Sequence, residues 1–408
     1  MMRYHELLAL FRNRADYAGA GIDFGNGLVL RNFDFHSRAR FPHLSPETSR
    51  NTAVPASASA DLRGQAGACS LLDKADAEIE ENLRFRYQVM LPSADGKARG
   101  VIIMLHGFNE KRWLKYLPWA AHFVLRTGKA ALMFPIAFHM NRAPAAWSDA
   151  RSMHRLSRER RRLYPELVGS SLSNVAISTR LHNMPARFIW SGLESYHDLL
   201  DLVEAIKRGE HPAIAAGADI DFFSYSIGTL LGEITVLTNK NGYFSQSRCA
   251  AFCGGPVFNR LSPVSKFILD SEANVRLYSY LIEHLDSHMK SDPRLERLLT
   301  GEEEGINLRS LLNYRVNLAY REEKLRAASG RFYAVALERD EVVPPYEVIN
   351  TLQGSRKDIG IRVDILDYPY PYRHEEPFPA GVSGGASLPG EIDRQFRRTF
   401  DSISAFLA

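Results

Sequence analysis

The chain has 408 residues, of which 45% are hydrophobic and 24% charged, which is the composition of a globular protein with one large domain or two ordinary ones. The formal net charge of +4 is small and no nucleic-acid-binding motif is present, so we expect no nucleic-acid partner. Three cysteines (Cys69, Cys249 and Cys253) have neither the number nor the spacing of a disulfide framework or a metal site.

The sequence shows no clear signal for targeting, for crossing a membrane or for binding a cofactor. The apolar residues 7–11 are followed directly by Arg12, Arg14 and Asp16, which differs from the long apolar stretch of a signal peptide. No apolar run approaches the length of a membrane span. No metalloprotease, phosphate-loop or dinucleotide motif occurs either. We therefore expect a cytoplasmic protein without a membrane span, cofactor or metal, and the sequence does not indicate its oligomeric state.

Residues 151–162 carry much of the positive charge, in six arginines. Such a cluster can attract an anionic substrate or surface. It is also typical of the solvated face of a surface helix, which is the interpretation we favour.

In chain order, residues 1–45 contain two short strand-like pieces, and residues 44–66 are rich in Ser, Ala, Pro, Thr and Asn, which predicts an exposed loop. Residues 67–82 are polar and mostly helix-compatible. We therefore predict that residues 1–82 form an N-terminal extension and residues 83–408 the main domain.

Strands and helices alternate from residue 83 onward. Apolar runs predict strands at 84–91, 101–105, 130–134, 220–223, 248–252, 332–337 and 363–366. Helices are predicted at about 112–126, 193–206, 228–237 and 392–406, with a helical block at about 262–328. This alternation predicts an α/β fold with a mainly parallel, doubly wound sheet covered on both faces. Two segments, at about 137–190 and 257–322, interrupt it, and we interpret them as insertions that cap the ligand-binding edge of the sheet.

Ser226 lies between the strand that ends at Phe223 and the helix that begins at Gly228. A strand-to-helix turn this tight needs small residues two positions before and after its centre, and Ser224 and Gly228 meet that need. The turn lifts the serine hydroxyl out of the strand end and points the helix N-terminus at it. Gly232 would let the helix lie close to the sheet. Ser-x-Ser-x-Gly alone is a weak motif, but in this context it predicts a nucleophile.

A His-Gly pair, His106 and Gly107, follows the buried strand 101–105. It allows a sharp turn that points backbone N–H groups toward the serine. We predict that the N–H groups of Phe108 and Ile227 form an oxyanion hole. His106 itself is expected to be structural.

The acid and the base are expected after the last two strands. Asp340 is preferred as the acid, because the sequence Glu-Val-Val-Pro that follows it resembles a turn common after this strand in α/β folds. Glu338 and Glu341 are the alternatives. His374 lies in an aromatic, proline-rich loop before the final helix. We predict that His374 deprotonates Ser226 and that Asp340 orients the imidazole.

These segments, in this order and after these strands, resemble the α/β-hydrolase superfamily over residues 83–408. The resemblance implies a sheet of about eight strands, the second antiparallel, with the triad on loops at the carboxyl ends. Residues 134–142 are also similar to a bacterial group within that superfamily without assigned activity. The turn departs from the superfamily by opening with Ser224 in place of glycine.

We therefore predict a hydrolase that cleaves an ester or thioester of a small or medium-sized acyl substrate through an acyl-enzyme on Ser226. An acyltransferase is the alternative, since a bound alcohol or amine can replace water. A non-catalytic binding protein with the same fold is a third possibility, weakened because no triad residue is missing. Asn109, Tyr225 and His139 are further candidates for substrate contact.

Overall fold

A computed structural model of the chain describes residues 2–14, 19, 21–25, 27–38, 72, 74–93, 96–380 and 388–408. The expected polar loop at about 44–66 and Cys69 lie outside these residues. Cys249 and Cys253, which are described, are both buried free thiols.

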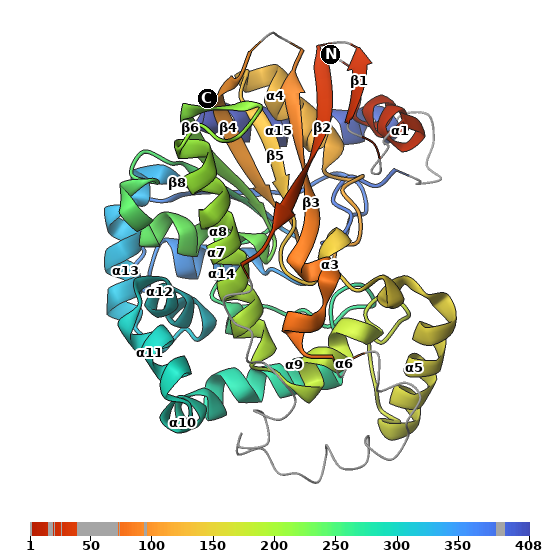
Figure 1. Ribbon diagram of the computed structural model, residues 1–408, viewed down its shortest axis with the longest axis vertical. Helices are drawn as coiled ribbons and strands as arrows, with labels where there is room; N and C mark the ends of the chain where they lie inside the picture. Colours follow the sequence, from red (N-terminus) through yellow and green to blue (C-terminus); the bar gives the residue numbers. More distant parts are fainter. Residues whose placement is uncertain are drawn as a thin grey trace.

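The described residues form one nine-stranded sheet, with the strand order β1-β2-β3-β5-β4-β6-β7-β8-β9 (Figure 1). The strands are β1 (Gly21–Gly25), β2 (Leu28–His36), β3 (Arg84–Pro92), β4 (Ala98–Leu105), β5 (Ala130–Phe134), β6 (Ile214–Tyr225), β7 (Cys249–Phe252), β8 (Phe332–Leu337) and β9 (Arg362–Leu366). From β5 to β9 all neighbouring strands pair in parallel. β3 is antiparallel to both β2 and β5.

The eight strands β2 to β9 therefore have the arrangement expected of an α/β-hydrolase fold. Their second strand is antiparallel and the crossover places β5 before β4 in the sheet. The fold class predicted from the sequence is confirmed. β1 is a ninth strand, paired antiparallel with β2 at the edge. Both β1 and β2, which lie within the expected extension, thus belong to the sheet, while the limits of the extension and of the insertions stay predictions.

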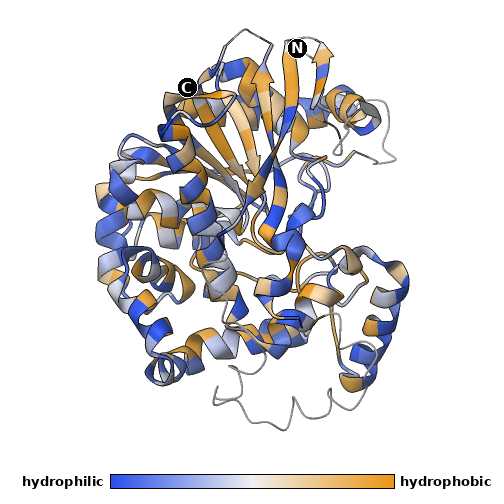
Figure 2. Ribbon diagram, viewed as in Figure 1, coloured by the Kyte–Doolittle hydropathy of each residue, from blue (hydrophilic) through white to orange (hydrophobic). Residues whose placement is uncertain are grey.

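The sheet is buried because its strands are apolar on both sides. In β4, Val101, Ile103 and Leu105 pack into the core on one face, and Ile102 and Met104 into the core on the other. Helices α7 and α8 cover the first face, and α1, α4 and α15 cover the second. Figure 2 shows the central strands as almost continuously hydrophobic, whereas the surrounding helices alternate with polar residues.

The helices match the predicted positions closely where the apolar period is clear. The longer helices are α1 (Tyr4–Arg14), α4 (Leu117–Thr127), α5 (Ala150–Leu163), α6 (Val175–Asn183), α7 (Arg187–Lys207), α8 (Gly228–Thr238), α9 (Ser271–Ser279), α10 (Leu285–Ser291), α11 (Pro293–Gly301), α12 (Glu303–Leu312), α13 (Leu318–Ala327), α14 (Pro345–Leu352) and α15 (Leu388–Leu407). The short α3 (Glu80–Leu83) precedes β3. α4 ends at Gly128, whose φ of 70° allows the left-handed cap that glycine favours. Among the described helices, none combines the length and the apolarity that a membrane crossing requires.

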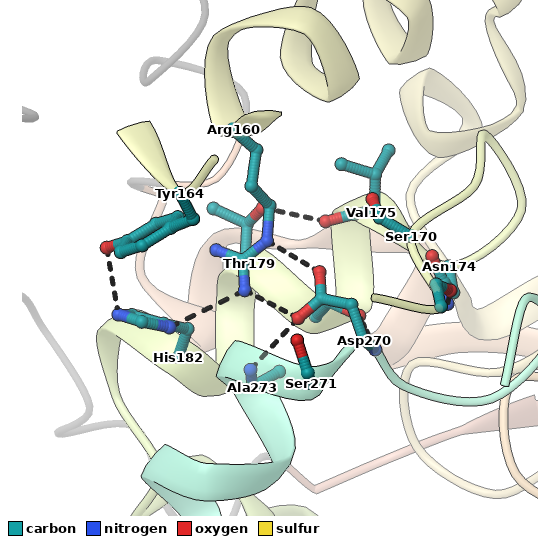
Figure 3. A network of polar contacts seen from close by, with 12 residues as sticks. Arg160, Tyr164, Ser170, Asn174, Val175, Thr179, His182, Asp270, Ser271 and Ala273 are labelled. Atoms are coloured by element: carbon teal, nitrogen blue, oxygen red, sulfur yellow. Dashed lines mark hydrogen bonds and ion pairs between the residues drawn. The ribbon is translucent and has the colours of Figure 1, made fainter. Parts of the chain in front are cut away.

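Helices from the two predicted insertions lie together below the sheet in Figure 1. A buried ion pair joins them, as Figure 3 shows: Arg160 of α5 donates to both carboxylate oxygens of Asp270, at 2.6 and 2.7 Å. Asp270 also caps α9 by accepting the N–H of Ala273 at 2.9 Å. His182 of α6 lies beside the guanidinium and contacts the Tyr164 hydroxyl at 3.1 Å. Burial lowers the pKa of His182 to about 4, so this imidazole is neutral near pH 7.

The arginine-rich stretch is α5, and it is mostly the surface helix that we favoured. Arg151, Arg155 and Arg158 are exposed, as are Arg161 and Arg162. Arg160 is the exception and faces inward to its carboxylate partner.

Candidate active site

Ser226 occupies a strained turn between β6 and α8. Its φ of 55° lies in the left-handed region that serine rarely adopts. A Cβ on Gly228 would lie 2.6 Å from the carbonyl oxygen of Leu105, and a Cβ on Gly232 would lie 2.5 Å from the Ser224 hydroxyl. Neither position has room for a side chain, which confirms the need for glycine at both. Strain of this kind is concentrated at functional turns.

A continuous hydrogen-bonded chain runs from this serine through His374 to Asp340. The Ser226 hydroxyl lies 2.8 Å from Nε2 of His374. Nδ1 of the same imidazole lies 2.8 Å from Oδ2 of Asp340. Because a carboxylate accepts hydrogen bonds, Nδ1 carries the proton and Nε2 is free to accept the serine proton. All three side chains are buried, with Ser226 9% exposed.

Backbone groups fix the orientation of the Asp340 carboxylate. Its Oδ1 accepts the N–H groups of Val342 and Val343, both at 2.9 Å, which leaves Oδ2 for His374. The alternative acids, Glu338 and Glu341, are exposed on the same loop. Only Asp340 of these three carboxylates reaches the imidazole in the structure.

The turn after β4 brings Phe108 beside the serine turn. Phe108 and Ile227 both line one cavity. Within the described residues, neither of their backbone N–H groups donates to another backbone or side-chain acceptor. Two unused backbone donors near a serine hydroxyl are what a developing oxyanion requires.

The Phe108 loop is held in place by three side chains below it. His106 contacts the Gly107 carbonyl through Nδ1 at 2.8 Å and accepts the Ile136 N–H on Nε2 at 2.9 Å. Burial holds the pKa of His106 well below its usual range, so the ring is neutral. The Gly107 N–H donates to the Tyr116 hydroxyl at 2.9 Å, and that hydroxyl donates to Glu110 at 3.0 Å. His106 is thus structural, as expected.

Tyr225 contacts the loop that carries His374 and helps to hold it in place. Its hydroxyl donates to the backbone carbonyl of His374, and its ring stacks on the imidazole with centroids 5.5 Å apart. Tyr225 is buried, and burial raises the pKa of its hydroxyl well above the usual range, so it remains a donor. Sequence reasoning named Tyr225 for substrate contact; its hydroxyl is instead engaged by the protein.

The other two candidates lie on opposite sides of Phe108. Asn109 has a φ of 58° and donates through its amide to the carbonyls of Ser173, at 3.1 Å, and Phe267, at 2.6 Å. It therefore connects the loop to both predicted insertions. His139 lines the cavity, and burial lowers its pKa to about 3, which keeps the ring neutral.

Two cavities lie at the serine turn, and Ser226 lines only the smaller one. One, of about 10 Å³, is lined by Ser226 itself and by residues of the loops after β7 and β8. The other, of about 70 Å³, has mainly apolar walls and contains Phe108. Both are lined by Ile227 and Leu230, so they lie side by side along α8.

Metal ions have no evident place in this site. Across the described ranges, no group of three or more His, Cys, Asp or Glu side chains is arranged to hold one. What the site offers is a hydroxyl, an imidazole whose Nε2 lies within hydrogen-bond distance of it, a carboxylate on the other side of the imidazole, and two backbone donors. This set can assist attack by an oxygen nucleophile on a carbonyl carbon.

Comparison with known proteins gives one family and several structures. A family of unknown function, DUF6051, matches residues 1–408. Among curated proteins, none matches the chain. Similar solved structures include a thermostable esterase from Pseudomonas putida ECU1011, with 9% identity, 80% of either chain covered and a TM-score of 0.44. Carboxyl esterase 2 from the mycorrhizal fungus Tuber melanosporum has 12% identity, covers 79% of this chain and 81% of its own, and has a TM-score of 0.42. A hyperthermophilic esterase from the archaeon Pyrobaculum calidifontis has 13% identity, covers 80% of this chain and 81% of its own, and has a TM-score of 0.41.

Proposed function

This chain belongs to the DUF6051 family, whose function is unknown, and we propose that it is a serine hydrolase that cleaves an ester or thioester through an acyl-enzyme on Ser226. The observation that carries the proposal is the hydrogen-bonded chain from Ser226 through His374 to Asp340, with both links at 2.8 Å. Its substrate is a small or medium-sized acyl compound, since the two cavities at the serine turn have volumes of about 10 and 70 Å³.

The first half of the reaction follows from the proton positions. His374 takes the hydroxyl proton on Nε2 while the Ser226 oxygen bonds to the carbonyl carbon of the ester. The carbonyl oxygen becomes negative and accepts the N–H groups of Phe108 and Ile227. The imidazolium then gives its proton to the departing alcohol or thiol, which leaves an acyl group on the serine. Asp340 stabilises the imidazolium through Nδ1.

The second half repeats these steps with water. His374 takes a proton from the water, whose oxygen attacks the acyl carbon, and the same two N–H groups receive the oxyanion. Collapse returns the proton to the Ser226 oxygen and releases the carboxylic acid. An alcohol or amine in place of water would give acyl transfer, and product analysis with added acceptors distinguishes the two reactions.

Two other residues have supporting roles in this proposal. Tyr225 positions His374 by holding its carbonyl, and Asn109 holds the Phe108 loop against the predicted insertions. Of the helices in those insertions, α6 lines the larger cavity through Ile177, Arg180 and Leu181, and we assign it to a cap over that cavity. A covered site of this kind favours one substrate shape over others.

The proposal is tested with a fluorophosphonate probe, which reacts with an activated serine. The wild type should be labelled, and Ser226→Ala should not. Ser224→Ala is the matched control, because this buried hydroxyl lies two residues away in the same turn and does not contact His374 in the structure. Absence of labelling in the folded wild type would refute the proposal, as would labelling of Ser226→Ala at the wild-type rate.

A further inference from the structure

The larger cavity follows one face of α8. Ile227, Leu230, Leu231 and Ile234 line it, and positions three and four apart in a helix share a face. At 1.5 Å of rise per residue, these positions extend over about 10 Å of helix axis. Ser226 lines only the smaller cavity, but Phe108 and Ile227, the two proposed oxyanion donors, line this one. The larger cavity therefore begins next to the proposed nucleophile and leads away from it along α8.

The charged residues in its wall are engaged by the protein. Arg180 donates to both oxygens of Asp76, at 2.6 and 2.7 Å, and its guanidinium lies 3.7 Å from the centre of the Phe138 ring. Arg187 lies 3.4 Å from the same carboxylate. His139 is neutral. The remaining wall is almost entirely aliphatic or aromatic, which suits an uncharged hydrocarbon chain and disfavours a charged one.

The cavity has a volume of about 70 Å³, which is room for roughly five groups the size of a water molecule or a methylene. We infer that this cavity binds the acyl chain and selects unbranched, uncharged chains of about four to six carbon atoms. This inference rests on the function proposed above and adds the substrate class.

Two residues determine how much chain fits. Leu308 of α12 is buried in the cavity wall, from a helix that packs on α8. Gly192 of α7 also lines the cavity, and a Cβ there would meet no atom within 4 Å. Removing the Leu308 side chain therefore lengthens the cavity, whereas adding a side chain at Gly192 fills it. Leu312, one turn further along α12, is equally buried but is not one of the described residues around this cavity.

The test measures kcat/KM for p-nitrophenyl esters with acyl chains from two to twelve carbons, divided by the fraction of enzyme that the fluorophosphonate probe labels. In the wild type, kcat/KM should rise about fourfold for each added methylene, up to about four to six carbons, and then fall. Leu308→Ala should move the optimum about two carbons longer. Gly192→Leu should move it to about two or three carbons. Leu312→Ala should leave it unchanged.

Gly192→Leu keeps the test decisive if Leu308→Ala does not fold, because leucine stabilises a helix relative to glycine. A wild-type profile that is flat, or an optimum beyond about eight carbons, would overturn the inference and leave the serine hydrolase function standing. The same holds if Gly192→Leu keeps the wild-type optimum, or if Leu308→Ala and Leu312→Ala shift it alike. A wild type that is neither labelled nor active on any ester overturns both proposals.

Discussion

Replacing Asp340 by asparagine should stop the reaction while leaving the fold intact. In the wild type, Oδ1 accepts the N–H groups of Val342 and Val343, and Oδ2 accepts Nδ1–H of His374. An asparagine at this position has one oxygen and one NH₂ group of nearly the same shape. The two backbone donors require an acceptor, so they fix the amide oxygen in the place of Oδ1. The NH₂ group must then face the imidazole.

This orientation forces the wrong tautomer on His374. Nδ1 has to accept a proton from the amide, so the ring proton moves to Nε2 and faces Ser226. Nε2 can no longer accept the hydroxyl proton. Where this exchange has been measured in a triad of this type, kcat falls about 10⁴-fold, which corresponds to about 5 kcal/mol in the barrier. We expect a loss of the same order for Asp340→Asn.

The assay is kcat on a short-chain p-nitrophenyl ester, with the rate of fluorophosphonate labelling as a second readout of serine reactivity. Glu338→Gln is the matched control, because it removes a carboxylate from the same loop that is exposed in the structure, and it should change kcat less than twofold. A loss of less than tenfold for Asp340→Asn would refute the orienting role of this carboxylate. A large loss for Glu338→Gln would instead identify that alternative as the acid.

Three further predictions concern stability and the geometry of the serine turn. Arg160→Leu leaves its buried carboxylate partner unpaired and should lower the free energy of unfolding in urea by about 3–5 kcal/mol, whereas Arg158→Leu on the exposed face of α5 should change it by less than about 0.5 kcal/mol. Gly228→Ala should abolish labelling, because its Cβ would lie 2.6 Å from a backbone carbonyl oxygen, while Gly217→Ala in open space should not. The pKa of His139 is about 3 when folded and near 6.5 when unfolded, so the unfolded state binds more protons in this window and stability should fall as the pH drops from about 6.5 toward 3. In His139→Phe this fall should be shallower; an unchanged slope would contradict the low pKa.

The fold, and the placing of the proposed reacting groups at one edge of the sheet, could be predicted because each group follows a strand with a visible apolar run. The strand 101–105 precedes the Phe108 loop, and the strand ending at Phe223 precedes Ser226, even though β6 starts earlier than predicted, at Ile214. Parallel strands bring their carboxyl ends to one edge of a sheet, so the order along the chain already implies proximity. The sequence could not choose firmly among the three carboxylates after β8, since only the burial of Asp340 separates it from its exposed neighbours.

What the sequence could not predict depends on partners far away in the chain. Arg160 has the same sequence context as its exposed neighbours in α5, and only Asp270, more than a hundred residues later, makes it a buried residue. The same applies to β1, a five-residue segment with a glycine at each end, which becomes a strand by pairing with β2. The spacing of apolar residues predicts which face of a helix or strand is buried, but it does not identify the distant polar residue that pairs with a buried charge on that face.

The sequence also did not predict the side chains that hold the Phe108 loop, the serine turn and the His374 loop in place. These side chains connect the three segments to one another. Tyr225 precedes the nucleophile and holds the carbonyl of His374, so the serine turn and the histidine loop cannot shift independently. Lys115 donates to the carbonyl of Glu375 at 3.0 Å and lies over the Tyr225 ring, 4.6 Å from its centre. It also pairs with Glu110, which accepts from the Tyr116 hydroxyl beneath the Phe108 loop. Through these contacts the position of the base is tied to the position of the oxyanion donors. The proton transfer and the charge stabilisation that the proposed reaction needs at the same moment therefore depend on one shared set of buried and half-buried polar groups.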